Sequence, residues 1–230
     1  GWSGTAAYDI NVDHTLKLFS MLDPQRCRQV IYFSTASMLD RSNQSLAAAA
    51  KGTDYIASKF QGYHRLQETA IYDRCTVIFP TAVMGGSPRH PYSHLSQGIC
   101  QYRRYWRYLR WFQLDGSFHF IHAQDLAQVT AALIQRPPSQ RVELVLGHAA
   151  ISVGQALAAI ARAQGYRTPF QIPLPTEVIM KGIMRGKKDL SDWDRFCLQY
   201  RHFRHQITTP AARGVDSRFK TFEACVRDAL

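Results

Sequence analysis

Short apolar, β-branched runs alternate with longer helical stretches along this chain, and this alternation constrains the fold more than any other feature. The apolar runs lie at 29–34, 76–79 and 142–146, and the helical patterns lie at 54–72 and 123–135. A strand, a helix and a second strand at this spacing favour parallel pairing, because the crossover has room for the helix. We therefore predict an α/β fold with a parallel sheet.

Further elements surround this pattern. We predict an amphipathic helix at 8–22 and a short strand at 118–121. Ser152 has the position of an N-cap for the helix that follows it, and Gly165 has the position of its C′ residue. Beyond Pro173 the pattern weakens, so we expect short basic and aromatic helices and loops there.

The composition is that of a globular protein. Of 230 residues, 46% are hydrophobic and 20% are charged, which is enough to bury a sizeable core. No apolar run reaches about 18 residues, so no transmembrane helix is predicted. The first residues lack the basic and apolar segments of a signal peptide. The five cysteines are scattered without metal-ligand spacing, so we expect reduced thiols in a cytoplasm and no metal site.

A phenol, an ammonium and a hydroxyl are placed where they could act together. Tyr55 and Lys59 share one face of the predicted helix, and Thr35 follows the preceding strand. A free tyrosine titrates near ~10, and a neighbouring ammonium favours its phenolate. Thr35 could hold a substrate oxygen, Tyr55 could pass the proton and Lys59 could tune Tyr55, which suits hydride chemistry at a carbinol or ketone carbon.

Five segments occur in a fixed order around these residues. They are Asn-Val-Asp-His-Thr at 11–15, Ile-Tyr-Phe-Ser-Thr-Ala-Ser at 31–37, Tyr-x-x-x-Lys at 55–59, Phe-Pro-Thr-Ala-Val-Met-Gly at 79–85 and Phe-Ile-His-Ala-Gln-Asp-Leu-Ala at 120–127. In this order the sequence resembles the extended short-chain dehydrogenase/reductases, the NAD-dependent epimerase/dehydratase family, over roughly residues 8–165. Aligning the Ser-Thr pair assigns the catalytic hydroxyl to Thr35 rather than Ser34.

The sequence also departs from that pattern. His14 stands where the family has a glycine, and Phe79 stands where it has an arginine. The family begins with a glycine-rich turn that seats the cofactor pyrophosphate on a helix N-terminus, and no such turn follows a strand here. We therefore expect an N-terminally incomplete copy that lacks about 60–90 residues of βα structure. The alternative is a degenerate relative that has lost cofactor binding.

The resemblance implies a Rossmann-like, doubly wound parallel sheet, N-terminally incomplete, with a small and mostly helical C-terminal substrate lobe. Residues 1–150 would form the partial dinucleotide-binding domain, with 86–117 contributing to the substrate lobe. Residues 151–230 would form most of that lobe. Family members commonly dimerise through two helices that correspond to 8–22 and 54–72, so a homodimer is expected.

The implied activity is that of an NAD(P)-dependent oxidoreductase or epimerase/dehydratase using Thr35, Tyr55 and Lys59. The cofactor would be NAD or NADP. The substrate would be a small molecule, and a nucleotide-linked compound is one option. The alternative is a non-catalytic accessory or binding protein on the same fold, which could contact anionic lipid or a protein partner.

Further residues would lie near the cofactor by the same resemblance. The cofactor would be bordered by Asn11, Pro80 and Val83 in addition to Tyr55 and Lys59. For Asn11, an ordinary helix N-cap is an equally good interpretation.

Arginines and aromatic residues are interleaved at 103–112. If this segment is helical, Arg103, Arg107 and Arg110 line one face. They could hold a nucleotide diphosphate, lie on an anionic membrane or bind single-stranded nucleic acid. They could also form a solvated basic face above an aromatic core. The net charge of +11 is compatible with each, and we expect no nucleic-acid partner.

Overall fold

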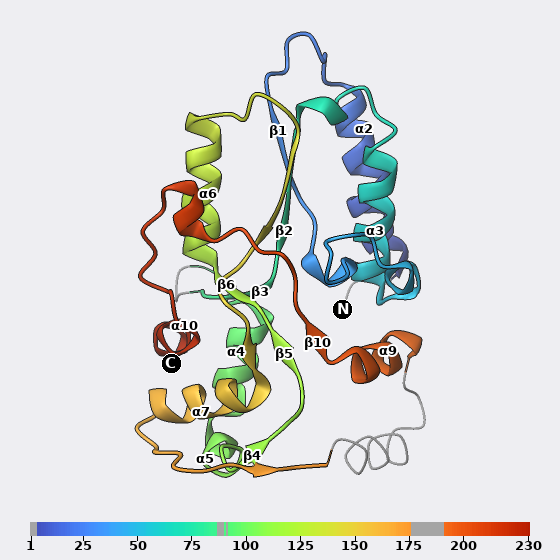
Figure 1. Cartoon of the computed structure of the whole chain (residues 1–230). Helices are drawn as coiled ribbons and strands as arrows, with labels where there is room; N and C mark the ends of the chain where they lie inside the picture. Colours follow the sequence, from blue (N-terminus) through green and yellow to red (C-terminus); the bar gives the residue numbers. More distant parts are fainter. Residues whose placement is uncertain (1–3, 87–89, 91, 176–190) are drawn as a thin grey trace.

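The computed structural model describes residues 4–86, 90, 92–175 and 191–230 (Figure 1). Its main sheet has three parallel strands in the order β1-β2-β7. These are β1 (Val30–Phe33), β2 (Cys75–Pro80) and β7 (Val142–Leu146). The helices α2 (Thr15–Ser20) and α3 (Asp54–Leu66) cover one face, and α6 (Ala123–Gln135) covers the other (Figure 1). The predicted α/β class and the parallel pairing are confirmed.

The central strand β2 lies between two hydrophobic cores, and its side chains alternate between them. Val77 and Phe79 belong to the cluster under α3, whereas Ile78 packs with Leu133 of α6. Since successive side chains of a strand point to opposite faces, a strand covered on both sides is apolar throughout. The edge strand β1 differs, because its last residue, Phe33, is 38% exposed.

Two of the predicted helices have different bounds in the structure. The helix expected at 8–22 consists of α1 (Gly4–Tyr8), a π-helical turn η1 (Asp9–His14) and α2. The helix expected at 54–72 ends at Leu66, and a 3-10 turn η4 (Tyr72–Arg74) follows. It ends early because the carbonyl of Leu66 accepts hydrogen bonds from both the amide and the hydroxyl of Thr69.

The helix α3 makes its closest approach to the π-helical turn at Gly62. A Cβ atom at this position would lie 2.6 Å from the carbonyl oxygen of Asn11 and 3.0 Å from the hydroxyl of Tyr32. One turn away, the Asn11 amide donates a hydrogen bond of 3.0 Å to the hydroxyl of Ser58. A glycine is therefore what lets these two backbones touch.

A second core lies below the sheet in Figure 1, around a two-stranded pair. The two strands of this pair are β3 (Ala82–Met84) and β6 (Phe120–His122). Three helices surround the pair: α4 (His94–Gln101), α7 (Val153–Ala163) and α10 (Phe222–Ala229). Phe120 lies at the centre of this cluster and contacts the ring of Phe222 edge-on, with 5.3 Å between ring centroids.

The strand expected at 118–121 is divided in two at His119. Its first part, β5 (Ser117–Phe118), lies between β8 (Ile151–Ser152) and β10 (His202–Phe203), whereas β6 pairs with β3. The carbonyl of His119 accepts the amide of Ala82 and its ring bonds to the backbone at His148, so the chain changes sheet at this residue.

Two local signals in the sequence gave correct helix ends. Ser152 caps α7 in a capping box with Gln155, as its position predicted. Gly165 follows α7 with a φ of 84°, a conformation that favours glycine. The bounds predicted for α6 and β7 also agree with the structure.

The segment at 103–112 is not one helix, which corrects that expectation. It forms a 3-10 turn and one short helix, after which Phe112 pairs with Ile172. Arg103, Arg107 and Arg110 therefore do not share one face of a continuous helix. The elements are η5 (Arg103–Tyr105), α5 (Trp106–Leu109), β4 (Phe112–Gln113) and β9 (Ile172–Pro173).

The remaining elements are short. They are η2 (Ala36–Met38), η3 (Ala47–Lys51), α9 (Asp192–Tyr200) and η6 (Pro210–Arg213). Among the helices of the described ranges, none has the length and apolar content needed to cross a membrane.

We predict that Gly62→Ala lowers the free energy of unfolding by roughly 1–3 kcal/mol, because its Cβ would overlap the Asn11 carbonyl. Gly98→Ala is the matched control, since Gly98 also lies inside a helix but has open space around it. That variant should be more stable by up to about 1 kcal/mol. Urea unfolding of both variants measures the difference, and equal stabilisation of the two would contradict the contact.

Candidate active site

Thr35, Tyr55 and Lys59 come together at the carboxyl end of β1. Tyr55 is 49% exposed at the start of α3, and the Thr35 hydroxyl lies near enough to affect its pKa. The ammonium of Lys59, one turn further along α3, donates a hydrogen bond of 3.1 Å to the carbonyl of Phe33. The structure therefore brings together the three residues that the sequence pattern grouped, and their catalytic roles stay a prediction.

Local backbone signals place these side chains. Thr53 caps α3, its hydroxyl accepting the amide of Ile56, so Tyr55 falls in the first turn. Thr35 caps η2, where its hydroxyl accepts the amide of Ser37. The neighbouring hydroxyl of Ser34 is buried and donates a hydrogen bond to the sulfur of Met38.

The ionisation of these groups differs from the expectation drawn from their spacing. Burial raises the pKa of Tyr55, and the nearby Thr35 hydroxyl offsets only part of that rise. Burial also lowers the pKa of Lys59. The expected downward shift of the Tyr55 pKa by Lys59 is therefore not seen. The Lys59 ammonium is instead held by Phe33 and lies 5.5 Å from the centroid of the Tyr32 ring.

An open cavity of about 740 Å³ lies beside this group. It is lined by Ala7, Ile10, Asn11, Asp54, Tyr55, Lys59 and His94. Asn11 sits inside the π-helical turn and is not an N-cap, and its place near the cofactor stays a prediction. Pro80 and Val83 are absent from this lining. Val83 lines a different cavity, together with His122 and Arg218.

A second, smaller cavity of about 210 Å³ lies beyond Thr35. It is lined by Ala36, Ser37, Thr81, Ala82, Phe118, His119, Trp193, Cys197, Phe203 and His205. Among these described residues there is no lysine, arginine or carboxylate. The cavity is therefore mostly apolar, with hydroxyl, thiol and imidazole groups as its polar atoms.

The two histidines of the smaller cavity differ in what they can offer a ligand. His119 has both nitrogens engaged, since Nδ1 bonds to the carbonyl of His148 and Nε2 accepts the amide of His205. His205 donates Nδ1 to the carbonyl of Asp40 at 3.1 Å, which leaves Nε2 without a partner among the described residues. Burial lowers the pKa of His205, so its free nitrogen is a neutral hydrogen-bond acceptor.

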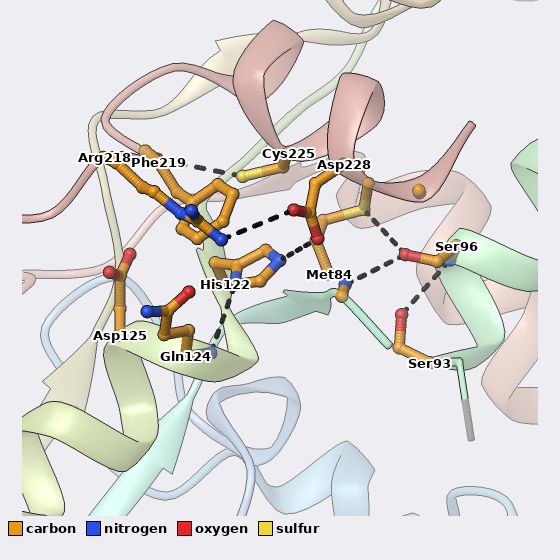
Figure 2. A network of polar contacts seen from close by, with 12 residues as sticks. Met84, Ser93, Ser96, His122, Gln124, Asp125, Arg218, Phe219, Cys225 and Asp228 are labelled. Carbon is orange, nitrogen blue, oxygen red and sulfur yellow. Dashed lines mark hydrogen bonds and ion pairs between the residues drawn. The ribbon is translucent and has the colours of Figure 1, made fainter. Parts of the chain in front are cut away.

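His122 and Asp125 do not form a pair, although they are three residues apart. His122 accepts the amide of Gln124 at Nδ1 and bonds through Nε2 to Asp228 at 3.2 Å, and its ring stacks on Phe219 (Figure 2). Because both ring nitrogens are used, His122 is a structural residue at the start of α6.

The carboxylate of Asp125 is almost fully buried in the same region. It accepts hydrogen bonds from Ser217 at 2.8 Å and from Nε2 of His148 at 2.9 Å. No sequence pattern indicates this network, because its members lie 23 and 92 residues from Asp125. The network fixes the segment after β7 and the segment before α10 to α6.

With the fold and site described, comparison with known proteins identifies the family. The profile of the NAD dependent epimerase/dehydratase family matches residues 3–167, so the chain belongs to that family. This confirms the resemblance inferred from the sequence motifs. No curated protein matches the chain.

Several solved structures share the fold. The protein gox2253 is 16% identical with a TM-score of 0.69, and the match covers 100% of this chain and 73% of that one. UDP-N-acetylglucosamine 4-epimerase from Methanobrevibacter ruminantium is 14% identical, with a TM-score of 0.60 and coverage of 96% and 67%. UDP-glucose 4-epimerase from Bifidobacterium longum, solved with NAD+ and UDP, is 16% identical, with a TM-score of 0.59 and coverage of 96% and 68%.

The cofactor of this family is NAD, and the cavity beside Tyr55 fits one end of it. The ammonium of Lys59 has three donors and gives one to Phe33, so donors remain for ribose hydroxyls. The Tyr55 phenol borders the same space. These residues would hold the nicotinamide riboside end of NAD. The expected cofactor class is confirmed by the family.

We predict that the free energy of unfolding falls as the pH is lowered from about 7 to about 5. Burial lowers the pKa of His119, His122 and His205 below the usual value of about 6.5. Below that value the unfolded chain binds protons that the folded chain does not, so stability decreases as the pH falls.

Chemical unfolding at a series of pH values measures this dependence. His119→Gln should make it shallower, because one buried imidazole is removed. His14→Gln, at an exposed position, is the control and should leave it unchanged. A stability that rises between pH 7 and 5 would contradict the burial of neutral histidines.

Proposed function

We propose that this protein is an NAD-dependent oxidoreductase that acts on a small neutral compound at a carbinol or ketone carbon. The observation that carries the proposal is that Tyr55 and Lys59 line one cavity and that Thr35 lies next to Tyr55. Membership of the NAD dependent epimerase/dehydratase family supports it. NAD, when bound, supplies the hydride acceptor at C4 of its nicotinamide.

Each residue has a role that follows from its position. The Thr35 hydroxyl would hold the substrate oxygen, and Tyr55 would take the proton of the substrate hydroxyl as the carbon loses its hydride and becomes a carbonyl. In the reverse direction Tyr55 returns that proton. Lys59 is fixed by the Phe33 carbonyl, so it would orient the ribose next to Tyr55. A positive charge on bound, oxidised nicotinamide would favour the phenolate of Tyr55, whose pKa burial raises.

The smaller cavity supports a neutral substrate rather than a nucleotide-linked one. A diphosphate is usually held by arginine or lysine side chains, and the described lining contains neither. Phe118 and Trp193 provide apolar surface, while Nε2 of His205 can accept a hydrogen bond from a hydroxyl or amide group. The UDP-containing neighbours share the fold with this chain, and their identities of 14–16% do not extend to its substrate.

We also propose that the protein forms a homodimer through α2 and α3. Leu18 and Met21, in and just after α2, are 59% and 68% exposed. Two such side chains near each other favour a partner at that face.

We predict that Tyr55→Phe in the full-length protein reduces turnover at least about 1000-fold, because the proton carrier is lost. Affinity for NADH, measured by fluorescence titration, should change less than about threefold, since the ring is kept. Tyr102→Phe, at an exposed site away from the cavity, is the control and should keep full activity. Turnover by Tyr55→Phe at the normal rate would remove Tyr55 from the mechanism and favour an accessory role for the family fold.

We predict that small secondary alcohols and ketones are converted in preference to UDP-sugars. Within that panel, His205→Ala should raise KM about fivefold for substrates with a second hydroxyl group, because one hydrogen bond worth about 1 kcal/mol is lost. Substrates without that group should be unaffected. Efficient conversion of UDP-sugars alone would contradict the neutral cavity.

A further inference from the structure

The elements α5 and β4 lie at one end of the molecule, at the bottom of Figure 1, and β9 pairs with β4 there. Aromatic and aliphatic side chains in and next to these elements are exposed. They are Tyr102, Tyr105, Tyr108, Leu109, Phe170 and Ile172, which are between 38% and 61% exposed. We call these residues, together with Arg103, Arg104, Arg107 and Arg110, the arginine–tyrosine surface. The helix α3, which carries Tyr55 and Lys59, lies higher in the molecule, beside the main sheet (Figure 1).

Two separate segments of the chain form one continuous surface here. Phe112 pairs with Ile172 in the β4–β9 ladder, and the rings of Trp111 and Phe170 lie 5.1 Å apart. The guanidinium of Arg110 lies 5.1 Å from the centroid of the Tyr166 ring. The residues around α5 and those before β9 therefore share one face.

The charge of this surface has a single sign. Arg103, Arg104 and Arg107 are exposed, and no ion pair is recorded for them within the described ranges. The sequence contains no aspartate or glutamate at 74–114 or at 144–176, the stretches to which both segments belong. A partner for this surface must therefore supply negative charge together with an apolar phase.

The aromatic rings are already covered on one face by arginines. The guanidinium groups of Arg104, Arg107 and Arg110 lie 4.5–4.7 Å from the ring centroids of the residues that follow them. Nucleic acid platforms need open ring faces on which bases stack. Exposed aliphatic groups such as Leu109 and Ile172 contribute nothing to the stacking of bases. Their transfer from water into a lipid phase is favourable.

We propose that the arginine–tyrosine surface binds the anionic face of a lipid membrane. Its arginines would contact lipid phosphates, while its tyrosines and aliphatic side chains would enter the headgroup region, the depth that tyrosine and tryptophan favour. Attachment at this end leaves α3 and the cavity beside Tyr55 away from the lipid. The enzyme would then meet substrates that are dissolved in the water near the membrane or leave the bilayer.

Flotation of the full-length protein with lipid vesicles tests this. Binding should be strong on phosphatidylcholine vesicles that contain about 30% phosphatidylglycerol, weak on phosphatidylcholine alone, and much reduced at about 0.5 M salt. The variant Arg103→Gln/Arg104→Gln/Arg107→Gln should bind about 100-fold more weakly.

A matched control removes the same charge at the opposite end of the molecule. Arg26→Gln/Arg28→Gln/Arg74→Gln changes exposed arginines in the loop before β1 and in η4 (Figure 1), and its binding should change less than about threefold. An equal loss in both variants would show that only net charge matters, which would overturn the proposal. Thermal melting of both variants checks that they remain folded.

Two further measurements separate lipid from other partners. Tyr108→Ser/Leu109→Ser keeps the charge, and it should weaken binding to the anionic vesicles at least fivefold because the apolar part is lost. A single-stranded oligonucleotide should not displace the protein from the vesicles at equal phosphate concentration. Binding to the oligonucleotide without binding to vesicles would make this a nucleic acid surface and overturn the proposal.

Discussion

The geometry of the candidate site depends on one backbone contact, between the carbonyl of Asn11 and Gly62. This contact allows α3 to lie directly on the π-helical turn η1, where a larger residue would hold the two apart. The hydrogen bond from Asn11 to Ser58 then fixes the rotation of α3. Because Tyr55 and Lys59 belong to the same helix, the cavity wall they form follows from that rotation. Single π-helical turns often occur at functional sites, and here the turn carries the residue that aligns α3.

The site also contains groups whose burial costs stability. The hydroxyl of Tyr32 is buried between Lys59 and Gly62 with no hydrogen-bond partner in the described ranges, a cost of about 1–3 kcal/mol. Lys59 is partly desolvated, and a single carbonyl holds its ammonium. A region selected only for stability would not keep these groups, so their arrangement fits a function that needs a positioned cation and phenol.

Elements with local signals were predictable from the sequence. The bounds of α6 and β7 follow from their apolar patterns, and the capping box at Ser152 follows from its spacing to Gln155. The grouping of Thr35, Tyr55 and Lys59 came from the order of motifs. The π-helical turn has no sequence signature, since it depends on packing against α3. The division of the strand at His119 depends on its contacts with Ala82 and His148, and the orientation of His205 depends on a contact with Asp40 across 165 residues, which no local pattern contains.

The buried carboxylate of Asp125 has a consequence for the order of folding. Its partners include the hydroxyl of Ser217, which lies 92 residues later in the chain. At the start of the same helix, His122 bonds to the carboxylate of Asp228, which lies 106 residues later. Until those residues have been synthesised, Asp125 can bond to His148 but lacks the hydroxyl of Ser217, so its burial leaves a polar group only partly satisfied. The lower core should therefore close late, after most of the polypeptide has been synthesised, and slow long-range contact formation should set its rate.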